Sequence, residues 1–224
     1  MEKIGQMAAE IVHDLKNPMT VIKGYAEMSD SDIGPDRRRA YLERISQQVD
    51  RLTGMCYDIL DYAGEGIALD VREADLAFII RQILAHNHDR LAQALIETEL
   101  DLPATRPLPL DADRIHRVLL NLIANSIEAM EGISGPRRLR IAVKSDRERC
   151  ELIVADSGPG IPPEIQQRMF EPFATAGKAS GTGLGLSVVK NIVEAHLGTI
   201  AFTTGPASGT EFRITFLMDL DLNT

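Results

Sequence analysis

The sequence predicts an α + α/β protein, in which an antiparallel helical hairpin is followed by an α/β sandwich. Apolar residues first recur at three- and four-residue spacing, the pattern of amphipathic helices. Beyond Gly64, Glu65 and Gly66 the pattern changes to short alternating stretches mixed with helical ones, which is typical of a sheet covered by helices. The two glycines mark a hinge. We therefore predict one domain over residues 1–64 and a second over residues 65–224.

The first domain is expected to contain two helices joined by a turn at residues 29–36, where Gly34 and Pro35 interrupt the helical pattern. The two apolar stripes are Ile4, Ala8, Ile11, Leu15, Met19, Ile22 and Ala26, and then Leu42, Ile45, Val49, Leu52, Cys56, Ile59 and Ala63. One hairpin cannot bury both stripes, so we expect a homodimer whose two hairpins form a four-helix bundle. Pro18 lies inside the first helix and is expected to bend or locally break it.

The second domain is expected to contain several strands and three long helices. Strands are predicted at 67–71, 95–100, 139–145, 150–156, 200–204 and 210–218. Helices are predicted at 75–91, 111–130 and 184–195, with a proline-rich loop at 102–110. Asp75 is placed to cap the first of these helices.

Composition excludes several classes of protein. With 224 residues, 44% hydrophobic and 25% charged, the chain is typical of a soluble globular protein. The formal net charge of −9 argues against a nucleic-acid partner. Cys56 and Cys150 are too far apart in sequence to indicate a disulfide framework or a zinc site. No apolar run approaches the ~20 residues of a membrane span, so the chain is expected to be cytoplasmic, although the full-length protein could be membrane-attached. The short stretch before His13 predicts a sensory portion upstream or on another chain.

His13 is the first candidate for chemistry. At about 100° per residue, His13 and Asn17 lie on one helix face, away from the apolar stripe. A neutral imidazole is a nucleophile at neutral pH, and the Asp14 carboxylate can hold one ring nitrogen protonated while the other attacks. A solvated surface histidine is the alternative for an isolated residue of this kind, so the rest of the sequence has to decide.

The long helix predicted at 111–130 carries Asn121, Asn125 and Glu128 on one face. Their side-chain oxygens are of the type that Mg²⁺ prefers when phosphates fill its remaining positions. An ordinary polar helix face is the alternative. Asparagine is a mediocre helix former, however, and these two are flanked by leucine and isoleucine.

The strand predicted at 150–156 ends on Asp156, which is followed by Gly158 and Gly160. A carboxylate at a strand end can accept a hydrogen bond from an exocyclic amine such as that of adenine. Glycines let the backbone approach a flat ring without a Cβ in the way. A plain turn from strand to loop is the alternative interpretation.

Two further stretches suit a nucleotide. Residues 171–173 precede a small polar loop at 174–180 that contains Lys178, and this loop is either a lid over a nucleotide or a linker. A glycine-rich turn then opens into a helix, whose backbone N–H groups and positive end favour phosphate. Its residues are Gly181, Thr182, Gly183, Leu184, Gly185 and Leu186. Such a turn is a weak signal alone.

Together these stretches resemble a known family. In chain order they are similar to the H, N, G1, F and G2 boxes of bacterial sensor histidine kinases, at residues 13–18, 121–129, 156–161, 171–173 and 181–186. The resemblance implies a dimerisation and histidine-phosphotransfer domain at 1–64. It also implies an ATP-binding domain at 65–224 of the type shared with Hsp90, DNA gyrase and MutL.

The resemblance also implies roles for individual residues. His13 is the implied phosphoacceptor, Asp156 the ligand of the adenine amine, and Asn125 the Mg²⁺ ligand with Asn121 near the phosphates. Thr210 is similar to the threonine that supports the adenine contact. The implied ATP-binding residues are Asn121, Asn125, Asp156, Gly158, Gly160, Lys178, Gly181, Thr182, Gly183, Leu184, Gly185 and Thr210.

The implied function is an ATP-dependent autokinase that phosphorylates His13 and passes the phosphoryl group to an aspartate of a response regulator. Asp14 would be the orienting base. In the similar subfamily, an amide at the position of Asn17 also supports dephosphorylation of the regulator.

Three features depart from the commonest pattern of this family. The lid is short, Ser126 replaces the usual alanine, and one glycine precedes the Thr-Gly-Leu-Gly run. A related ATPase or serine kinase, or a catalytically silent dimeric scaffold that binds nucleotide, is the alternative.

Overall fold

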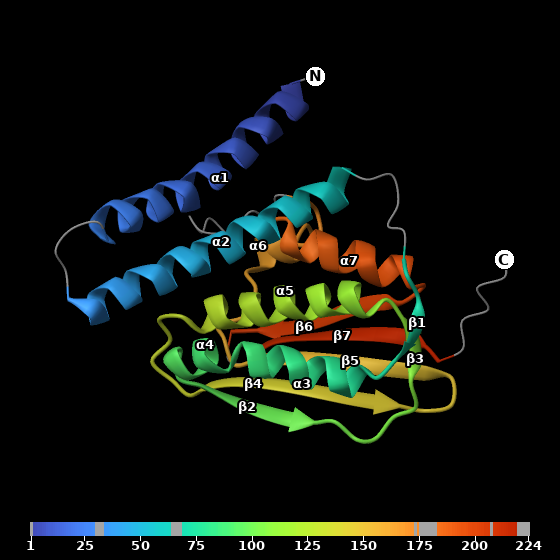
Figure 1. Ribbon diagram of the computed structural model, residues 1–224. Helices are drawn as coiled ribbons and strands as arrows, with labels where there is room; N and C mark the ends of the chain where they lie inside the picture. The colour runs from blue at the N-terminus through green and yellow to red at the C-terminus, as the bar shows by residue number, and fades with distance from the viewer. Residues whose placement is uncertain are drawn as a thin grey trace. The chain divides into compact units, whose positions relative to one another are not determined.

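The chain forms two compact units. A computed structural model describes residues 2–29, 34–63, 69–172, 174, 183–206 and 208–218. Unit 1 comprises Met1–Gly64 with Gly177–Leu184, and unit 2 comprises Glu65–Ala176 with Gly185–Thr224. The helices and strands of both are drawn in Figure 1. Within the described ranges, no helix combines the length and the apolar character that a membrane span requires.

Unit 1 holds two long helices, α1 (Glu2–Ser29) and α2 (Pro35–Ala63). The helices of unit 2 are α3 (Leu76–His86), α4 (His88–Gln93), α5 (Ala112–Met130), α6 (Pro163–Gln166) and α7 (Gly185–Ala195). Its strands are β1 (Arg72–Ala74), β2 (Ile96–Asp101), β3 (Leu108–Leu110), β4 (Arg137–Ser145), β5 (Arg149–Asp156), β6 (Thr199–Gly205) and β7 (Gly209–Leu217). This order of elements confirms the predicted fold class, a helical hairpin followed by an α/β sandwich.

Helices α1 and α2 pack against each other as the predicted hairpin (Figure 1). The rings of Tyr25 and Tyr41, one from each helix, have centroids 5.3 Å apart. The expectation that Pro18 locally breaks α1 is wrong, because α1 continues through it without interruption. A proline removes one backbone hydrogen bond, and the expected bend at Pro18 stays a prediction.

Unit 2 is built on a five-stranded sheet with the order β2-β4-β5-β7-β6. Strands β2 and β4 are parallel, whereas every other neighbouring pair is antiparallel. Helices α3, α4, α5 and α7 lie on one face of this sheet (Figure 1). The core between the two layers includes Leu119, Leu122, Leu139, Ile141, Leu152, Val154, Val189 and Ile214. Burying each such side chain contributes about 1.5–3 kcal/mol to folding.

Two predicted elements have different boundaries in the structure. The strand expected at 67–71 is wrong, because residues 69–71 are irregular and β1 begins at Arg72, where it pairs with β3; residues 67 and 68 lie outside the described ranges. The helix expected at 75–91 starts as predicted, since Asp75 Oδ1 accepts the Phe78 N–H at 3.1 Å. It is divided at Asn87, which follows α3 and precedes α4; both its backbone N–H and its Nδ2 donate to the Ile83 carbonyl, at 3.0 and 2.9 Å.

The remaining differences concern short elements. The loop expected at 102–110 contains β3 at its end, which pairs antiparallel with β1 as a separate two-stranded sheet. The short helix α6 was not predicted, because four residues are too few for a periodic pattern. The expected hinge at 64–66 lies outside the described residues.

The edge strand β2 carries an acidic row. Five of its six residues are exposed, and three of these are Glu97, Glu99 and Asp101. Glu97 Oε2 lies 3.7 Å from Arg138 Nε on the neighbouring strand, and Asp101 Oδ2 lies 3.9 Å from Arg140 Nη2. Charges along an edge strand oppose its pairing with another chain.

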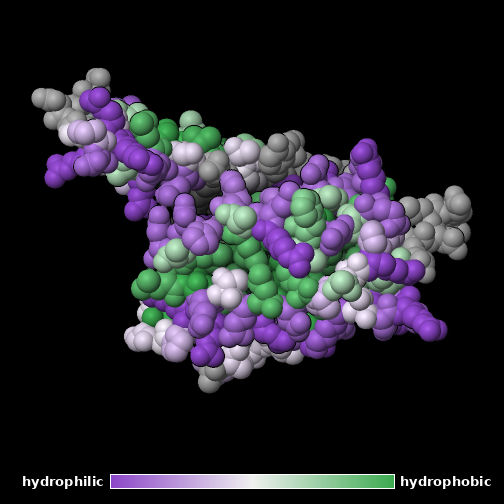
Figure 2. Space-filling view, turned by 60° about the horizontal axis from the view of Figure 1, so that its bottom comes forward, coloured by the Kyte–Doolittle hydropathy of each residue, from purple (hydrophilic) through white to green (hydrophobic). Residues whose placement is uncertain are grey.

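Figure 2 shows one face of the molecule, on which hydrophobic residues gather in the middle and hydrophilic ones border them.

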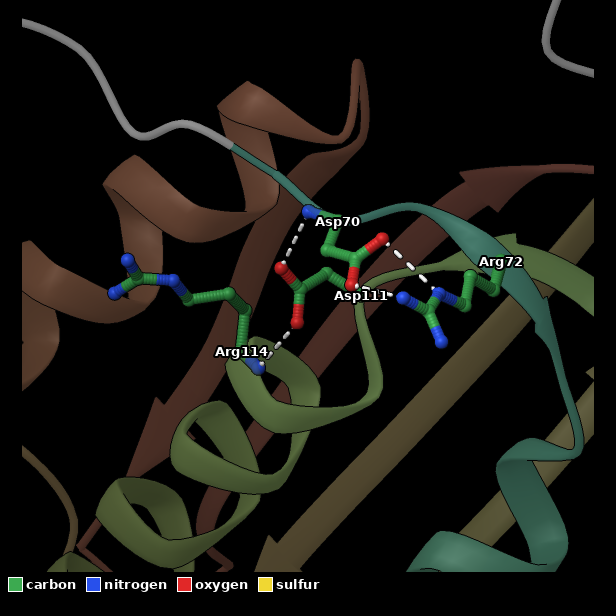
Figure 3. Close-up of polar contacts among 4 residues, drawn as sticks. All are labelled: Asp70, Arg72, Asp111 and Arg114. Carbon is green, nitrogen blue, oxygen red and sulfur yellow. Dashed lines mark hydrogen bonds and ion pairs between the residues drawn. The ribbon is translucent and has the colours of Figure 1, made fainter.

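Asp111 joins the segment before β1 to the start of α5 (Figure 3). Its Oδ1 accepts the Arg114 N–H at 3.0 Å, which caps the helix, and its Oδ2 accepts the Asp70 N–H at 2.9 Å. The carboxylate of Asp70 receives Arg72 Nε at 3.0 Å and Nη2 at 2.7 Å. One capping side chain therefore fixes the segment that leads into β1.

The buried His196 fixes the same helix start from the other side. The backbone N–H of Asp111 donates to His196 Nε2 at 3.0 Å, and His196 Nδ1 donates to the Ile192 carbonyl at 2.7 Å. These partners require a neutral ring with its proton on Nδ1. Burial lowers the pKa of His196 below its ordinary value of 6.5, although the Ile192 carbonyl and Asp111 oppose the shift. The C-terminus of α7 is thus tied to the N-terminus of α5.

The hydrogen bond between His196 and the Asp111 N–H predicts that unit 2 loses stability in mild acid. Between the ordinary and the lowered pKa, the unfolded chain binds a proton on His196 that the folded chain does not. The contribution of His196 to the free energy of unfolding should therefore be complete above about pH 6.5 and should decrease as the pH drops below that value. Burial also lowers the pKa of the half-buried His116, which adds to the slope. Urea denaturation at a series of pH values measures this dependence of the unfolding free energy on pH.

The variant His196→Asn provides the control, because asparagine keeps an acceptor for the Asp111 N–H but does not titrate. We expect this variant to be less stable than the parent at neutral pH and to show a shallower fall in acid. An unchanged slope in the variant would assign the pH dependence to other groups.

Candidate nucleotide site

Asp156 stands at the end of the central strand β5, where its carboxylate is held by backbone donors. Its side chain is only 8% exposed. Oδ1 accepts the Gly158 N–H at 2.8 Å and the Thr210 N–H at 3.3 Å. Thr210 is the direct partner of Asp156 in the β5–β7 register. The structure therefore brings together two predicted ligands of the adenine ring that are 54 residues apart in sequence.

Three glycines allow the backbone to close around this carboxylate. A Cβ on Gly209, which has φ +72°, would overlap the Asp156 carbonyl oxygen. A Cβ on Gly158 would lie 2.8 Å from Asp156 Oδ1 and 3.2 Å from the Ala129 Cβ. Gly160 has φ +81°, and a Cβ there would lie 2.6 Å from the Gly205 carbonyl oxygen. The glycines predicted after Asp156 are thus required by close packing and by backbone conformation.

Helix α5 places Asn121, the first of the predicted asparagines, beside the start of α7. Asn121 and Asn125 are half-buried on one side of α5, while Leu119, Leu122 and Ile123 are buried on the other. A Cβ on Gly185, the first residue of α7, would lie 3.3 Å from Asn121 Oδ1. The Nδ2 atom of Asn121 is buried and has no hydrogen-bond partner within the described part of the chain. A buried donor without a partner is costly unless a ligand satisfies it.

The two ends of the site lie along the same helix. Gly158 packs against Ala129 near the end of α5, and Gly185 packs against Asn121, eight residues earlier. At 1.5 Å per residue these points are about 12 Å apart. Carboxylate and small residues meet at one end, and an amide and a helix N-terminus meet at the other. The residues present therefore suit a ligand with a polar ring at one end and anionic oxygens at the other.

Several predicted site residues cannot be placed. Lys178, Gly181 and Thr182 lie outside the described residues, as does Phe173 of the stretch at residues 171–173. Gly183 has a positive φ of 66° just before α7, and Leu184 is buried. His13 and Asp14 belong to α1, but their side chains are outside the description, whereas the Asn17 side chain is exposed. No group of three or more His, Cys, Asp or Glu side chains suited to a metal ion occurs in the described ranges.

Sequence reasoning missed Thr204, whose hydroxyl lies 3.1 Å from Thr210 Oγ1 and accepts the Ile161 N–H at 2.8 Å. A signal for it was present. The predicted hairpin of residues 200–204 and 210–218 places Thr204 opposite Thr210 if the turn begins directly after residue 204. Thr204 is also a polar residue at an inward-facing strand position, where an apolar residue is expected unless the polar group has a role.

Family models match both units. The model described as "His Kinase A (phospho-acceptor) domain" matches residues 3–64. The model described as "Histidine kinase-, DNA gyrase B-, and HSP90-like ATPase" matches residues 110–220. The solved Acinetobacter baumannii histidine kinase AdeS is 30% identical, with a TM-score of 0.69 over 93% of this chain and 98% of that one. The chain belongs to the sensor histidine kinase family.

Other relatives of this sensor histidine kinase chain are longer. The sensor histidine kinase ZraS of Klebsiella oxytoca is 34% identical over 214 residues, which are 93% of this chain and 45% of ZraS. The histidine kinase ThkA, solved in complex with the response regulator protein TrrA, is 26% identical with a TM-score of 0.69, over 96% of this chain and 62% of that one. The chain thus spans about half the length of the curated relatives it matches. Unit 2 is an ATP-binding domain of this family.

The close approach at Gly209 predicts a severe effect of Gly209→Ala. The variant combines a positive φ with an overlap on the Asp156 carbonyl, so it should lower the free energy of unfolding by several kcal/mol. Gly132→Ala is the matched control, because Gly132 has φ +81° but nothing within 4 Å of its Cβ position. The control should cost only about 1 kcal/mol, the strain of the left-handed conformation. Urea denaturation of both variants measures the difference, and equal losses would contradict the overlap.

Proposed function

We propose that this chain is the phosphotransfer core of a histidine kinase, with its domain boundary at residues 64 and 65. The γ-phosphoryl group of ATP is transferred to a ring nitrogen of His13: an N–P bond forms as the bond from the γ-phosphorus to the bridging oxygen breaks and ADP leaves. One observation carries the proposal, namely that a phosphoacceptor hairpin over residues 3–64 and the site around Asp156 occur in one chain. An ATPase or a serine kinase would have no use for the hairpin.

The nucleotide end of the reaction is assigned to unit 2. Asp156 accepts the exocyclic amine of adenine, with Thr210 beside it and the glycine turn packed closely against Asp156. The Nδ2 atom of Asn121 has no partner within the described ranges, which supports a donor role toward the phosphates. By family resemblance, the phosphate loop is completed by Lys178, Gly181, Thr182, Gly183, Leu184 and Gly185.

Asn125 is the proposed Mg²⁺ ligand. Its amide oxygen is the hard donor that Mg²⁺ prefers, and Asn125 lies one helical turn beyond Asn121 on the same side of α5. Phosphate oxygens and water would fill the remaining positions. Bound Mg²⁺ supplies neutralisation of the phosphate charge, which is the main electrostatic demand of phosphoryl transfer.

The phosphoacceptor histidine and the residues that assist it are assigned to α1. The carboxylate of Asp14 follows His13 directly and is proposed to orient the imidazole and to take its proton as general base. Asn17 lies one turn further along α1 with its side chain exposed. This amide is proposed to orient a water molecule when the phosphorylated regulator is hydrolysed.

A second copy of this chain is the proposed partner of the hairpin. Among the described residues, six of the exposed large hydrophobic side chains lie on α1 and α2. They include Met19, Leu42 and Val49 from the two predicted apolar stripes, with Met19 58% and Leu42 56% exposed. Apolar seam residues left outside a single hairpin support its pairing into a four-helix bundle.

The phosphoryl group is then proposed to pass from His13 to an aspartate of a response regulator. The solved pairing of the histidine kinase ThkA with the response regulator protein TrrA is a precedent in a similar structure. Transfer restores the free imidazole, so the chain can react with another ATP.

The autokinase proposal is tested by incubating the purified chain with Mg²⁺ and γ-labelled ATP. We expect label on the protein that is labile to acid and stable to base, as a phosphoramidate is. His13→Gln should abolish it. His88→Gln, at an exposed histidine of α4, is the matched control and should keep full labelling. Labelling of His13→Gln, or label that resists acid, would overturn the proposal; nucleotide binding without labelling would favour the silent scaffold.

The role of Asn17 predicts separate effects on two activities. Asn17→Ala should leave autophosphorylation within about twofold and slow dephosphorylation of a phosphorylated regulator by about 10²-fold, the size of a positioning effect. Loss of phosphate from the regulator, followed over time with and without the kinase core, measures it. Lys16→Ala, at the neighbouring exposed position, serves as the control. Unchanged dephosphorylation in Asn17→Ala would remove this role.

A further inference from the structure

Thr204 completes a polar row at the end of the sheet in unit 2. Asp156 is paired with Thr210 across β5 and β7, and Thr210 is paired with Thr204 across β7 and β6. Residues directly opposite in neighbouring strands point to the same face. The row therefore extends the two predicted ligands of the nucleobase by a third polar side chain, on the face covered by the helices.

The Thr204 hydroxyl has more partners than protons. Its oxygen accepts the Ile161 N–H at 2.8 Å, and it lies 3.2 Å from the Gly209 carbonyl and 3.1 Å from Thr210 Oγ1. A carbonyl cannot donate, so the single proton of Thr204 is used by Gly209. The contact with Thr210 then requires the proton of Thr210. This arrangement leaves the lone pairs of Thr210 Oγ1 as acceptors.

Thr204 also holds the turn that follows Asp156. A Cβ on Gly160 would lie 3.0 Å from Thr204 Oγ1, so the turn packs directly on this residue. The Ile161 carbonyl is held from the other side by Gln166 Nε2 at 2.7 Å. One hydroxyl therefore links the turn at residues 157–161 to the strand that carries Thr210.

We propose that Thr204 is a positioning residue that selects a 6-aminopurine nucleotide by fixing the direction of the Thr210 hydroxyl. With its proton directed at Thr204, Thr210 offers an acceptor next to the Asp156 carboxylate. An amine donor on the ring is favoured by two neighbouring acceptors, whereas a carbonyl oxygen at the same position is repelled. The inference rests on the proposed nucleotide site and adds the residue that sets its polarity.

Removing the Thr204 hydroxyl should relax this selection. In Thr204→Val the Thr210 hydroxyl loses its acceptor and is free to turn its proton toward the ligand. A 6-oxopurine then finds a donor where the parent offers an acceptor. The affinity for ATP should fall and that for ITP should rise, so their ratio should narrow by about five- to tenfold, the size of one hydrogen bond.

The experiment measures the dissociation constants of ATP and ITP with Mg²⁺ by calorimetry on the whole chain. ITP is the sharp probe, because it differs from ATP only where the amine is replaced by a carbonyl and a ring N–H. Thr204→Ser keeps the hydroxyl and should restore the parent ratio. Thr203→Val is the matched control on the exposed side of β6 and should leave both constants unchanged.

The outcomes separate the inference from the proposed function. A parent chain that binds neither nucleotide overturns the proposed function itself. A parent that prefers ATP, together with equal losses for ATP and ITP in Thr204→Val, makes Thr204 a structural residue and overturns the inference. If Thr204→Val does not fold, Thr204→Ala, which leaves room for water, replaces it. Failure of both to fold also overturns the selective role.

Discussion

The carboxylate of Asp156 is the constraint on which the geometry of unit 2 depends. Oδ1 draws in the N–H groups of Gly158 and Thr210, so it sets both the turn after β5 and the start of β7. The close approach this requires admits no side chain at Gly209 and leaves little room at Gly158. A side chain predicted to bind a ligand thus also organises the backbone around it, which keeps the site formed before any ligand arrives.

A second polar junction ties the two helices that border the site. Asp111 caps α5 with its side chain, and its backbone N–H donates to His196 at the end of α7. Helix α5 carries Asn121, and α7 begins at Gly185 beside it. Because both helices are fixed at the end away from that contact, the buried neutral imidazole contributes to the spacing between Asn121 and Gly185. The chemistry of a histidine far from the ligand therefore bears on the geometry of the site.

Long periodic patterns predicted the hairpin, α5, α7 and the strands of the main sheet, because side-chain burial alone decides such elements. Helix ends and short strands were predicted less well, because local contacts decide them: both donors of Asn87 bind the Ile83 carbonyl at the end of α3, and β1 pairs with β3. Motifs identified Asp156 and its glycines. Thr204 was missed because its contacts depend on the register between β6 and β7, and the predicted hairpin sets this register only once the position of its turn is known.

The site carries local costs that the fold around it offsets. Asn121 buries an amide donor that has no partner among the described residues, and Gly160 and Gly209 give up the conformational freedom of glycine to hold the left-handed conformation. Each feature costs stability in the folded chain, whereas the layers of leucine, isoleucine and valine on either side of α5 supply the excess that tolerates it. A ligand that pairs with the Asn121 amide removes one of these costs on binding. The affinity of such a ligand then includes the gain from pairing the buried Asn121 donor. This favours ligands that bring a hydrogen-bond acceptor close to Asn121.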